Sequence, residues 1–242
     1  MAELTFGKST LEYEIVRSDR RSTVGIEVAP DSHLIVRAPF DVDESRISEI
    51  VCGKASWILA RLAKVGLLRQ SHTEKEFVSG ESFPYLGRLY RLKVVNNGIH
   101  PRTKIELKDG RLRVAVNADF EPQERRDAIR EALLDWYREH ARGVLEAKVN
   151  SLAKKIGVAP SGTVLRNQGK RWGSCTRNGV LNLNWRIVMA PNSIVEYVVA
   201  HELCHLKIHD HSKYFWQLLA AIVPDYEKRR EWLRFNGQTL NL

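Results

Sequence analysis

The chain has 242 residues, 43% of them hydrophobic, and a formal net charge of +9. This length allows one large domain or two small ones, and the hydrophobic content suffices for a buried core. No apolar run approaches the ~20 residues of a membrane-spanning helix, and the first residues lack the basic and apolar segments of a signal peptide. The three cysteines are widely spaced and odd in number, which argues against a disulfide framework. We therefore expect a cytoplasmic protein with reduced thiols and no membrane contact.

Basic residues occur in short groups rather than in one long tract. Acidic residues lie among most of them, so a solvated surface is the favoured interpretation and weak association with nucleic acid is the alternative. The groups are Arg17 to Arg21, Arg88 to Lys93, Lys170-Arg171 and Lys228 to Arg230. This pattern makes no prediction about the oligomeric state.

The first part of the chain, residues 1–118, is predicted to form a mostly-β domain with one helix. Apolar residues recur at helical spacing from Val42 to Gly66. A β region runs from Phe77 to Val95 and continues into a hairpin with Asp109-Gly110 at its tip. Alternating or β-branched patterns before the helix predict strands over Leu11–Val16, Val24–Val28 and Leu34–Arg37.

The second part, residues 119–242, is predicted to form an α+β domain built on a long helix. An apolar stripe extends from Pro122 to Ile156, and Gly157 is a natural stop. A β segment from Val164 to Val188 follows and contains the hairpin signal Asn178-Gly179. Near the end of the chain, Pro224 to Phe235 should form an amphipathic helix that packs on this domain.

The segment His201-Glu202-Leu203-Cys204-His205 carries the strongest chemical signal in the sequence. The residues around it, from Ile194 to Leu206, are almost all apolar, which predicts a buried helix. On a helix His201 and His205 lie one turn apart on the same face, where they can share a zinc ion. Glu202 can then reach a water molecule on that ion and act as a general base in hydrolysis.

A catalytic zinc site requires a third protein ligand, for which His209 and His211 compete. A helix continued to His209 would place this residue ~12 Å along the axis from His201, so three ligands in a line could not surround one ion. His211 fits better, because the residues before it can form a turn that leads into a new helix. Cys204 is expected to pack in the core. We predict one zinc ion per chain, with His201, His205 and His211 as its ligands.

The segment Arg171-Trp172-Gly173-Ser174-Cys175 has two interpretations, and both stay open. In one, Arg171 holds a substrate carboxylate or polarises a carbonyl, and Gly173 allows the backbone to approach the metal site closely. In the other, Trp172 and Cys175 are core residues and Arg171 pairs with an acidic residue. Peptide hydrolysis also needs a second donor for the oxyanion. The predicted substrate-binding residues are Arg171, Gly173, Asn184 and Tyr214.

These motifs together closely resemble those of the YgjP-like zinc metallopeptidases, relatives of the SprT-like proteases. Matching residues in the second half are Arg171 to Cys175, Leu181 to Asn184, Tyr197 to Leu206, His211-Ser212 and Phe215-Trp216. Matching residues in the first half are Trp57-Ile58, Ser79 to Glu81 and Phe83 to Gly87. The resemblance implies a zincin-type, minimal gluzincin-like domain with a long helix, a small sheet and an HExxH helix. It also implies that Glu202 is the base and that zinc is bound by His201, His205 and His211.

The predicted function is therefore zinc-dependent hydrolysis of peptide bonds in a peptide or protein substrate. In zincins a sheet edge beside the active-site helix holds the extended substrate, and part of Val164–Val188 is expected to supply it. One alternative is a non-catalytic, zinc-stabilised module that associates with nucleic acid through its positive charge. Another is a zinc hydrolase that acts on a non-peptide amide.

Overall fold

The computed structural model describes residues 2–6, 9–29, 33–70, 75–96, 103–169 and 171–242. Contacts within the chain divide it into two compact units, Met1–Thr73 and Glu74–Leu242. The division therefore falls about 45 residues before the boundary near residue 118 that the sequence pattern indicates. Each unit mixes helices with small sheets, and the predicted α+β fold class is confirmed.

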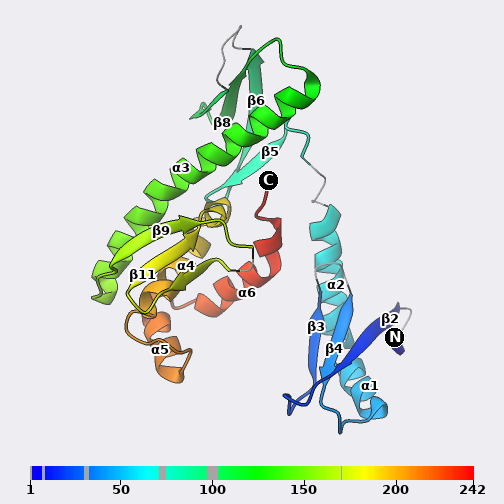
Figure 1. Ribbon diagram of the computed structural model, residues 1–242. Coiled ribbons are helices and arrows are strands. Elements are labelled where there is room, and N and C mark those ends of the chain that lie inside the picture. The colour runs from blue at the N-terminus through cyan, green and yellow to red at the C-terminus, as the bar shows by residue number, and fades with distance from the viewer. Residues whose placement is uncertain (1, 7–8, 30–32, 71–74, 97–102, 170) are drawn as a thin grey trace. The chain divides into compact units, whose positions relative to one another are not determined.

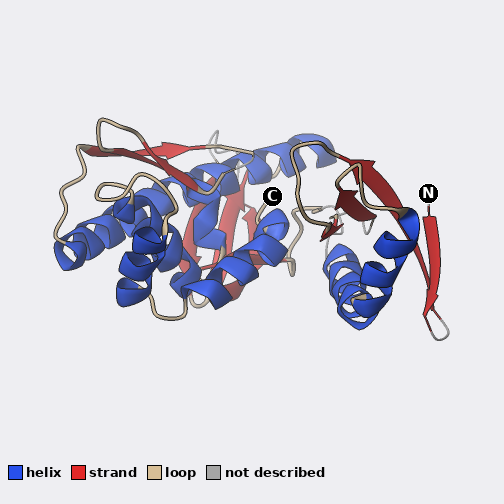
Figure 2. Ribbon diagram, turned by 90° about the horizontal axis from the view of Figure 1, so that it is seen from below, coloured by secondary structure: helices blue, strands red, loops and turns tan. Residues whose placement is uncertain are grey.

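The first unit is a four-stranded sheet with two helices on it. The strand order is β1-β2-β4-β3, and β2 runs parallel to β4 while the other pairs are antiparallel. Alternate residues of β2 and β4, such as Tyr13 and Val36, share a buried core with Ile47 and Val51 of the first helix. Figure 2 shows the strands and helices of this unit as separate layers. Its elements are β1 (Ala2–Phe6), β2 (Ser9–Arg17), β3 (Gly25–Val28), β4 (Leu34–Ala38), α1 (Glu44–Gly53) and α2 (Ala55–Gln70).

Two helices stand where the sequence predicts one continuous helix from Val42 to Gly66. The first, α1, ends at Gly53, and Lys54 has non-helical dihedral angles of φ −108° and ψ 4°. Its N–H donates to the Val51 carbonyl at 3.1 Å instead of to a carbonyl four residues back. Glycine stabilises a helix interior less than other residues do, which explains why the break falls there. The helical spacing of the apolar residues is the same on both sides of this single-residue break, so the sequence pattern does not predict the break.

The second unit begins with a sheet of the same topology as the first. Its strand order is β5-β6-β8-β7, and β6 and β8 are the parallel pair. The predicted hairpin between β7 and β8 is confirmed, with Asp109 and Gly110 at positive φ values of 52° and 69°. The strands are β5 (Ser82–Tyr85), β6 (Arg88–Asn96), β7 (Lys104–Lys108) and β8 (Arg111–Val116).

The helix α3 (Pro122–Ile156) is the longest element and has the predicted bounds. It ends at Gly157, whose φ of 72° gives the left-handed C-cap, and the Gly157 N–H donates to the Ala153 carbonyl at 2.9 Å. Figure 1 shows β6 and β8 near the first turns of α3, and β9 and β11 near its last turns. One helix therefore connects both sheets of the second unit.

Packing against α3 explains why β5 to β8 belong to the second unit. Phe83 of β5, Leu92 of β6 and Val114 of β8 share one buried core with Leu133 of α3. In addition, the Tyr137 hydroxyl donates to the Pro84 carbonyl at 2.7 Å. The sequence pattern shows where these strands lie along the chain but not which helix covers them, and so it groups them with the preceding residues.

A second sheet and three further helices complete this unit. The sheet has the order β10-β11-β9, in which β10 pairs antiparallel and β9 parallel with β11. The predicted β segment stops at Asn184, because the buried residues after it form a short 3-10 helix, η1. The elements are β9 (Gly162–Arg166), β10 (Gly173–Cys175), β11 (Val180–Asn184), η1 (Trp185–Met189), α4 (Asn192–Cys204), α5 (Lys213–Ile222), α6 (Tyr226–Asn236) and η2 (Gly237–Thr239).

Across the described ranges, no helix is both long enough and apolar enough to cross a lipid bilayer.

Candidate metal centre and active site

The helix α4 places the two histidines of the HExxH segment at its C-terminal end. The helix is buried on almost every side, with Val195, Val199 and Leu203 fully covered. It packs against α3 and η1, which hold it rigidly. His201 lies in the last turn and His205 is the C-cap residue, so both rings project from the end of a fixed helix.

His211 approaches the same point from the segment that follows α4. The chain turns after His205, and α5 begins at Lys213 with Ser212 as its N-cap residue, as the sequence predicts. The three imidazoles of His201, His205 and His211 each offer a ring nitrogen, and these atoms all lie within 4.8 Å of one another. The Nε2 atoms of His201 and His211 are 3.0 Å apart. His209 is exposed and lies outside this cluster.

Phe215 of α5 forms the floor beneath all three imidazoles. Its ring centroid lies 4.9 Å from that of His201, 4.6 Å from that of His205 and 4.8 Å from that of His211. The Phe215 side chain is fully buried, so it cannot move aside easily. It therefore restricts how far the three rings can rotate. In the sequence Phe215 is part of the family motif Phe215-Trp216, which does not indicate this position beneath the imidazoles.

Burial favours the neutral form of His201 and His205, which is the form that binds metal ions. Burial, followed by the charges of His205 and His211, lowers the pKa of His201 to about 3. Burial also lowers the pKa of His205. The Nδ1 atom of His205 lies 3.1 Å from the Ile208 carbonyl, which can only accept a hydrogen bond. Nδ1 must therefore carry the proton, and the lone pair of Nε2 is left for a ligand bond.

This set of donors fits a zinc ion. Three imidazoles with room for a fourth ligand is a common arrangement in catalytic zinc sites. Two ligands of a tetrahedral zinc, each about 2.1 Å from the ion, lie about 3.4 Å from each other. The His201 and His211 nitrogens are slightly closer together than this, and all three nitrogens lie within 4.8 Å of one another, so side-chain rotations can bring them onto one ion. Within the described structure, the buried Nδ1 of His201 has no hydrogen-bond partner.

Glu202 is a buried carboxyl group beside the cluster. Its side chain is only 6% exposed, and burial raises its pKa to about 7, while the positive charge of Arg171 acts in the opposite direction. The backbone of β10 lies directly against it. A Cβ atom added to Gly173 would be 2.6 Å from the Glu202 Cγ, which is closer than real Cβ contacts. The backbone at Gly173 therefore approaches the site closely, and the group that it contacts is the Glu202 side chain.

The other predicted substrate-binding residues lie in different environments. The side chain of Asn184 is buried, and its Nδ2 donates to the carbonyls of Gln168 and Arg171 at 2.7 and 3.2 Å. Its Oδ1 accepts from the Arg186 N–H at 3.1 Å, so the whole amide is engaged with backbone. Tyr214, in contrast, is 73% exposed in the first turn of α5.

Neither cysteine near the site has the character of a nucleophile. Burial raises the pKa of Cys204 to about 11, and its side chain is completely covered in the core, as expected. Burial, and then the charge of Glu202, raise the pKa of Cys175. A thiol with a raised pKa is protonated at neutral pH and reacts slowly.

Comparison with known proteins assigns the class and the family. A family model described as YgjP-like, metallopeptidase domain, matches residues 22–236. The protein is therefore a metallopeptidase, a hydrolase whose activity implies a metal cofactor. It belongs to the YgjP-like family, as the resemblance predicts. No curated protein sequence matches the chain.

Two solved structures share a limited likeness with the chain. One is the metallopeptidase zymogen of Pyrococcus abyssi abylysin, with a TM-score of 0.35 and 18% identity over 37% of this chain and 90% of that one. The other is the metallopeptidase zymogen of Methanocaldococcus jannaschii jannalysin, with a TM-score of 0.32 and 19% identity over 36% of this chain and 94% of that one.

Proposed function

We propose that this chain is a zinc-dependent peptidase in which His201, His205 and His211 hold the ion and Glu202 acts as general base. The observation that carries the proposal is the convergence of three imidazoles from two segments of chain, next to a buried carboxyl group. A zinc site that only stabilised a fold would need no unliganded acid beside its ligands and would close its fourth position with protein.

The chemistry divides between the ion and the side chains. Zinc bound here would polarise the carbonyl of the scissile bond and make a water molecule more acidic. Glu202 takes a proton from the attacking water at a carboxylate oxygen and transfers it to the nitrogen of the leaving amine. One water molecule is consumed for each peptide bond that breaks. The hydrogen bond from His205 to the Ile208 carbonyl keeps this imidazole in one tautomer and one orientation.

The substrate would lie in an extended conformation along β10. This strand pairs with β11 on one side, and among the described strands none pairs with its other side. Its first residue, Gly173, is in contact with Glu202, so a peptide bonded to this edge would pass the general base. Protection of the amides of Gly173 to Cys175 from hydrogen exchange by a bound peptide would support this placement, and unchanged exchange would contradict it.

A second donor for the oxyanion is needed near the scissile bond, and the side chains considered for it are Arg171, Asn184 and Tyr214. The amide of Asn184 already makes three bonds to the backbone, which favours Arg171 and Tyr214 over it.

The replacement Glu202→Gln tests the proposed mechanism, because it removes the base and preserves the shape of the side chain. The zinc-loaded protein should cleave peptides in a mixture of unmodified peptides, as followed by mass spectrometry. The variant should bind one zinc ion per chain and lose about 10²- to 10⁴-fold in rate. Glu231→Gln, at an exposed position of α6, is the matched control and should behave as the native chain does.

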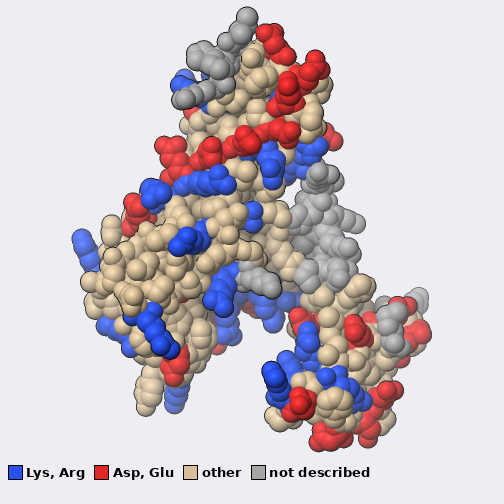
Figure 3. Space-filling view, viewed as in Figure 1, with Lys and Arg blue, Asp and Glu red and all other residues tan. Residues whose placement is uncertain are grey.

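Three other results would contradict the proposal. Turnover by Glu202→Gln at the rate of the control would show that this residue is not the base. Zinc binding without cleavage of any peptide, together with hydrolysis of a small non-peptide amide, would assign a different substrate class. Binding to DNA that weakens with salt but is indifferent to chelators would favour a nucleic-acid module. On the face that Figure 3 shows, basic and acidic side chains are interspersed rather than gathered in a continuous basic surface.

A further inference from the structure

The three imidazoles of the proposed metal centre are held in different ways. His201 and His205 project from the end of α4, which is buried on almost every side, and the Ile208 carbonyl orients His205. His211, in contrast, is exposed and lies in the irregular segment before α5. In the described part of the chain, its ring shares a hydrogen bond only with that of His201, which is another proposed ligand. The orientation of His211 must therefore come from packing.

Trp216, near the start of α5, packs against the His211 imidazole. The two ring centroids are 5.5 Å apart, and the two ring planes differ by only 28°. Phe215 meets the same imidazole at a steep angle of 69°, with the centroids 4.8 Å apart. The imidazole thus has one near-parallel and one edge-on aromatic neighbour. It cannot turn far without losing the favourable geometry of one of these contacts.

The helix α6 supports the Trp216 indole in turn. The Tyr226 ring stacks on the indole, with the centroids 5.3 Å apart and the planes 19° apart. One helical turn after Tyr226, the guanidinium carbon of Arg230 lies 5.0 Å from the indole centroid. Near-parallel aromatic contacts therefore lead from His211 through Trp216 to α6.

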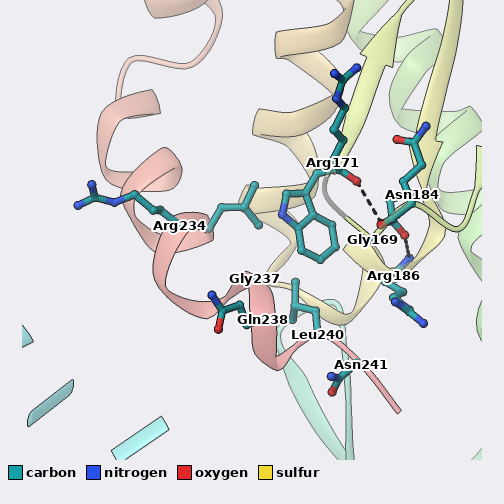
Figure 4. A pocket seen from close by; sticks show the side chains of 12 residues that line it. Gly169, Arg171, Asn184, Arg186, Arg234, Gly237, Gln238, Leu240 and Asn241 are labelled. Atoms are coloured by element: carbon teal, nitrogen blue, oxygen red, sulfur yellow. Dashed lines mark hydrogen bonds between the residues drawn. The ribbon is translucent and has the colours of Figure 1, made fainter. Parts of the chain in front are cut away.

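Contacts near both ends fix α6 in its place. Towards its start, the Arg229 guanidinium donates to the Ser193 carbonyl at 2.9 Å and to the Glu196 carboxylate at 2.7 Å, and both acceptors belong to α4. At its end, Gly237 lies so close to the Trp172 indole that an added Cβ atom would be 3.1 Å from the ring (Figure 4). The support behind Trp216 is therefore itself held firmly.

We propose that Trp216 is a positioning residue of the metal centre, which, supported by Tyr226, holds the His211 imidazole in the orientation that binds the ion. The inference rests on the proposed function, because it takes His211 as a metal ligand. An imidazole that is already oriented loses less rotational freedom when it binds. The affinity for the ion then depends on α6, although this helix contributes none of the three histidines.

The affinity for zinc tests the proposal, as measured on the full chain by competition with a chromogenic chelator. Trp216→Leu should weaken zinc binding by about 10- to 100-fold, the usual contribution of groups that orient a metal ligand. Trp216→Phe keeps an aromatic face beside His211 and should retain most of the affinity. Tyr226→Leu should weaken binding by about 2- to 10-fold, whereas Tyr226→Phe keeps the ring and should bind zinc as the native chain does.

Trp232→Leu is the matched control. It also removes a partly buried indole of the second unit, but this ring is not among the aromatic contacts of the three imidazoles in the described structure. The control should lose stability in urea denaturation of the metal-free protein and keep the native zinc affinity. Equal losses of zinc affinity in Trp216→Leu and Trp232→Leu would reflect general loosening of the fold and overturn the proposal. If Trp216→Leu does not fold, equal affinities of Tyr226→Leu and Tyr226→Phe would overturn it.

Cobalt provides a spectroscopic readout of the ligand arrangement. The visible absorption bands of protein-bound Co²⁺ depend on the geometry of its ligands. Trp216→Leu should therefore show altered bands, and Trp216→Phe and Trp232→Leu should show those of the native chain. Native bands in Trp216→Leu would contradict a positioning role.

A double replacement separates failure of this inference from failure of the proposed function. If Trp216 acts through His211, Trp216→Leu should change zinc affinity by less than about twofold in the His211→Ala background. Additive losses would show that Trp216 acts by another route and overturn the inference. Native affinity in Trp216→Leu, with weakened affinity in His211→Ala, would overturn the inference and leave the proposed metal centre standing. Native affinity in His211→Ala would overturn both, because His211 would not be a ligand.

Discussion

The replacement Gly173→Ala should disable the site without touching any proposed metal ligand. The new Cβ would lie 2.6 Å from the Glu202 Cγ, 2.7 Å from Oε1 and 2.8 Å from Cδ. Gly173 does not have a positive φ, so alanine suits the backbone there and the side-chain contact is the only penalty.

The size of the effect follows from these distances. Ordinary contacts of a Cβ atom begin near 3.4 Å, so Glu202 or β10 must move by nearly 1 Å. Because Glu202 is buried, the movement cannot be absorbed by solvent-exposed atoms. Overpacking of this kind costs about 1–3 kcal/mol of unfolding free energy. A displacement of about 1 Å in a catalytic group costs about 100-fold in rate.

The measurements are peptide cleavage, zinc content and urea denaturation, each on the variant and on a matched control. Gly162→Ala makes the same change in β9 of the same sheet, where nothing lies within 4 Å of the added atom. It should keep its activity. Gly173→Ala should keep its zinc, because the histidines come from α4 and the segment before α5.

A double replacement adds a test of the cause. The replacement Glu202→Ala removes Cγ, Cδ and Oε1 and with them the contact, so its stability change and that of Gly173→Ala should not add. Cleavage by Gly173→Ala within twofold of the Gly162→Ala rate would refute the reasoning, and so would strictly additive stability changes in the double variant.

Three further results are expected. His211→Ala should lose its zinc to a competing chelator that leaves the native chain and the His209→Ala control loaded, as measured by metal analysis, because only His211 belongs to the cluster. Arg229→Met should lower the unfolding free energy by about 1–2 kcal/mol, because this largely buried guanidinium joins α6 to α4. The hydrogen bond from Arg229 lowers the pKa of Asp225, so this pair stabilises the fold above the unfolded pKa of about 3.9, and the stabilisation is lost as the pH falls through the folded pKa. Below about pH 4 the native chain should therefore lose more stability than Arg229→Met. Parallel pH profiles of the two proteins in urea denaturation would contradict this. Asn184→Ala should lower the unfolding free energy by about 1–3 kcal/mol, because it removes a buried amide that donates to the carbonyls of Gln168 and Arg171. An unchanged denaturation midpoint would show that the loop before β10 does not depend on this amide.

The sequence alone predicts the elements that local periodicity and capping control. The apolar stripe and Gly157 place α3 at its observed bounds, because both signals act within a few residues. The HExxH spacing predicts that His201 and His205 share a helix face, and the turn after His205 favours His211 over His209. The break at Gly53 and the 3-10 helix after Asn184 were not predicted, because apolar spacing tolerates both.

Long-range packing decides the rest, since residues far apart in the chain meet only in the folded structure. The sequence does not show that Phe215 lies beneath the three imidazoles or that the Ile208 carbonyl orients His205. It suggests that Gly173 lies near a metal site, but it does not show that the Glu202 side chain leaves no room for a Cβ atom at this position. Composition shows many arginines without showing that one of them, Arg229, joins α6 to α4. Local preferences act over one turn or one strand, whereas these arrangements depend on how α4, α5 and β10 pack together.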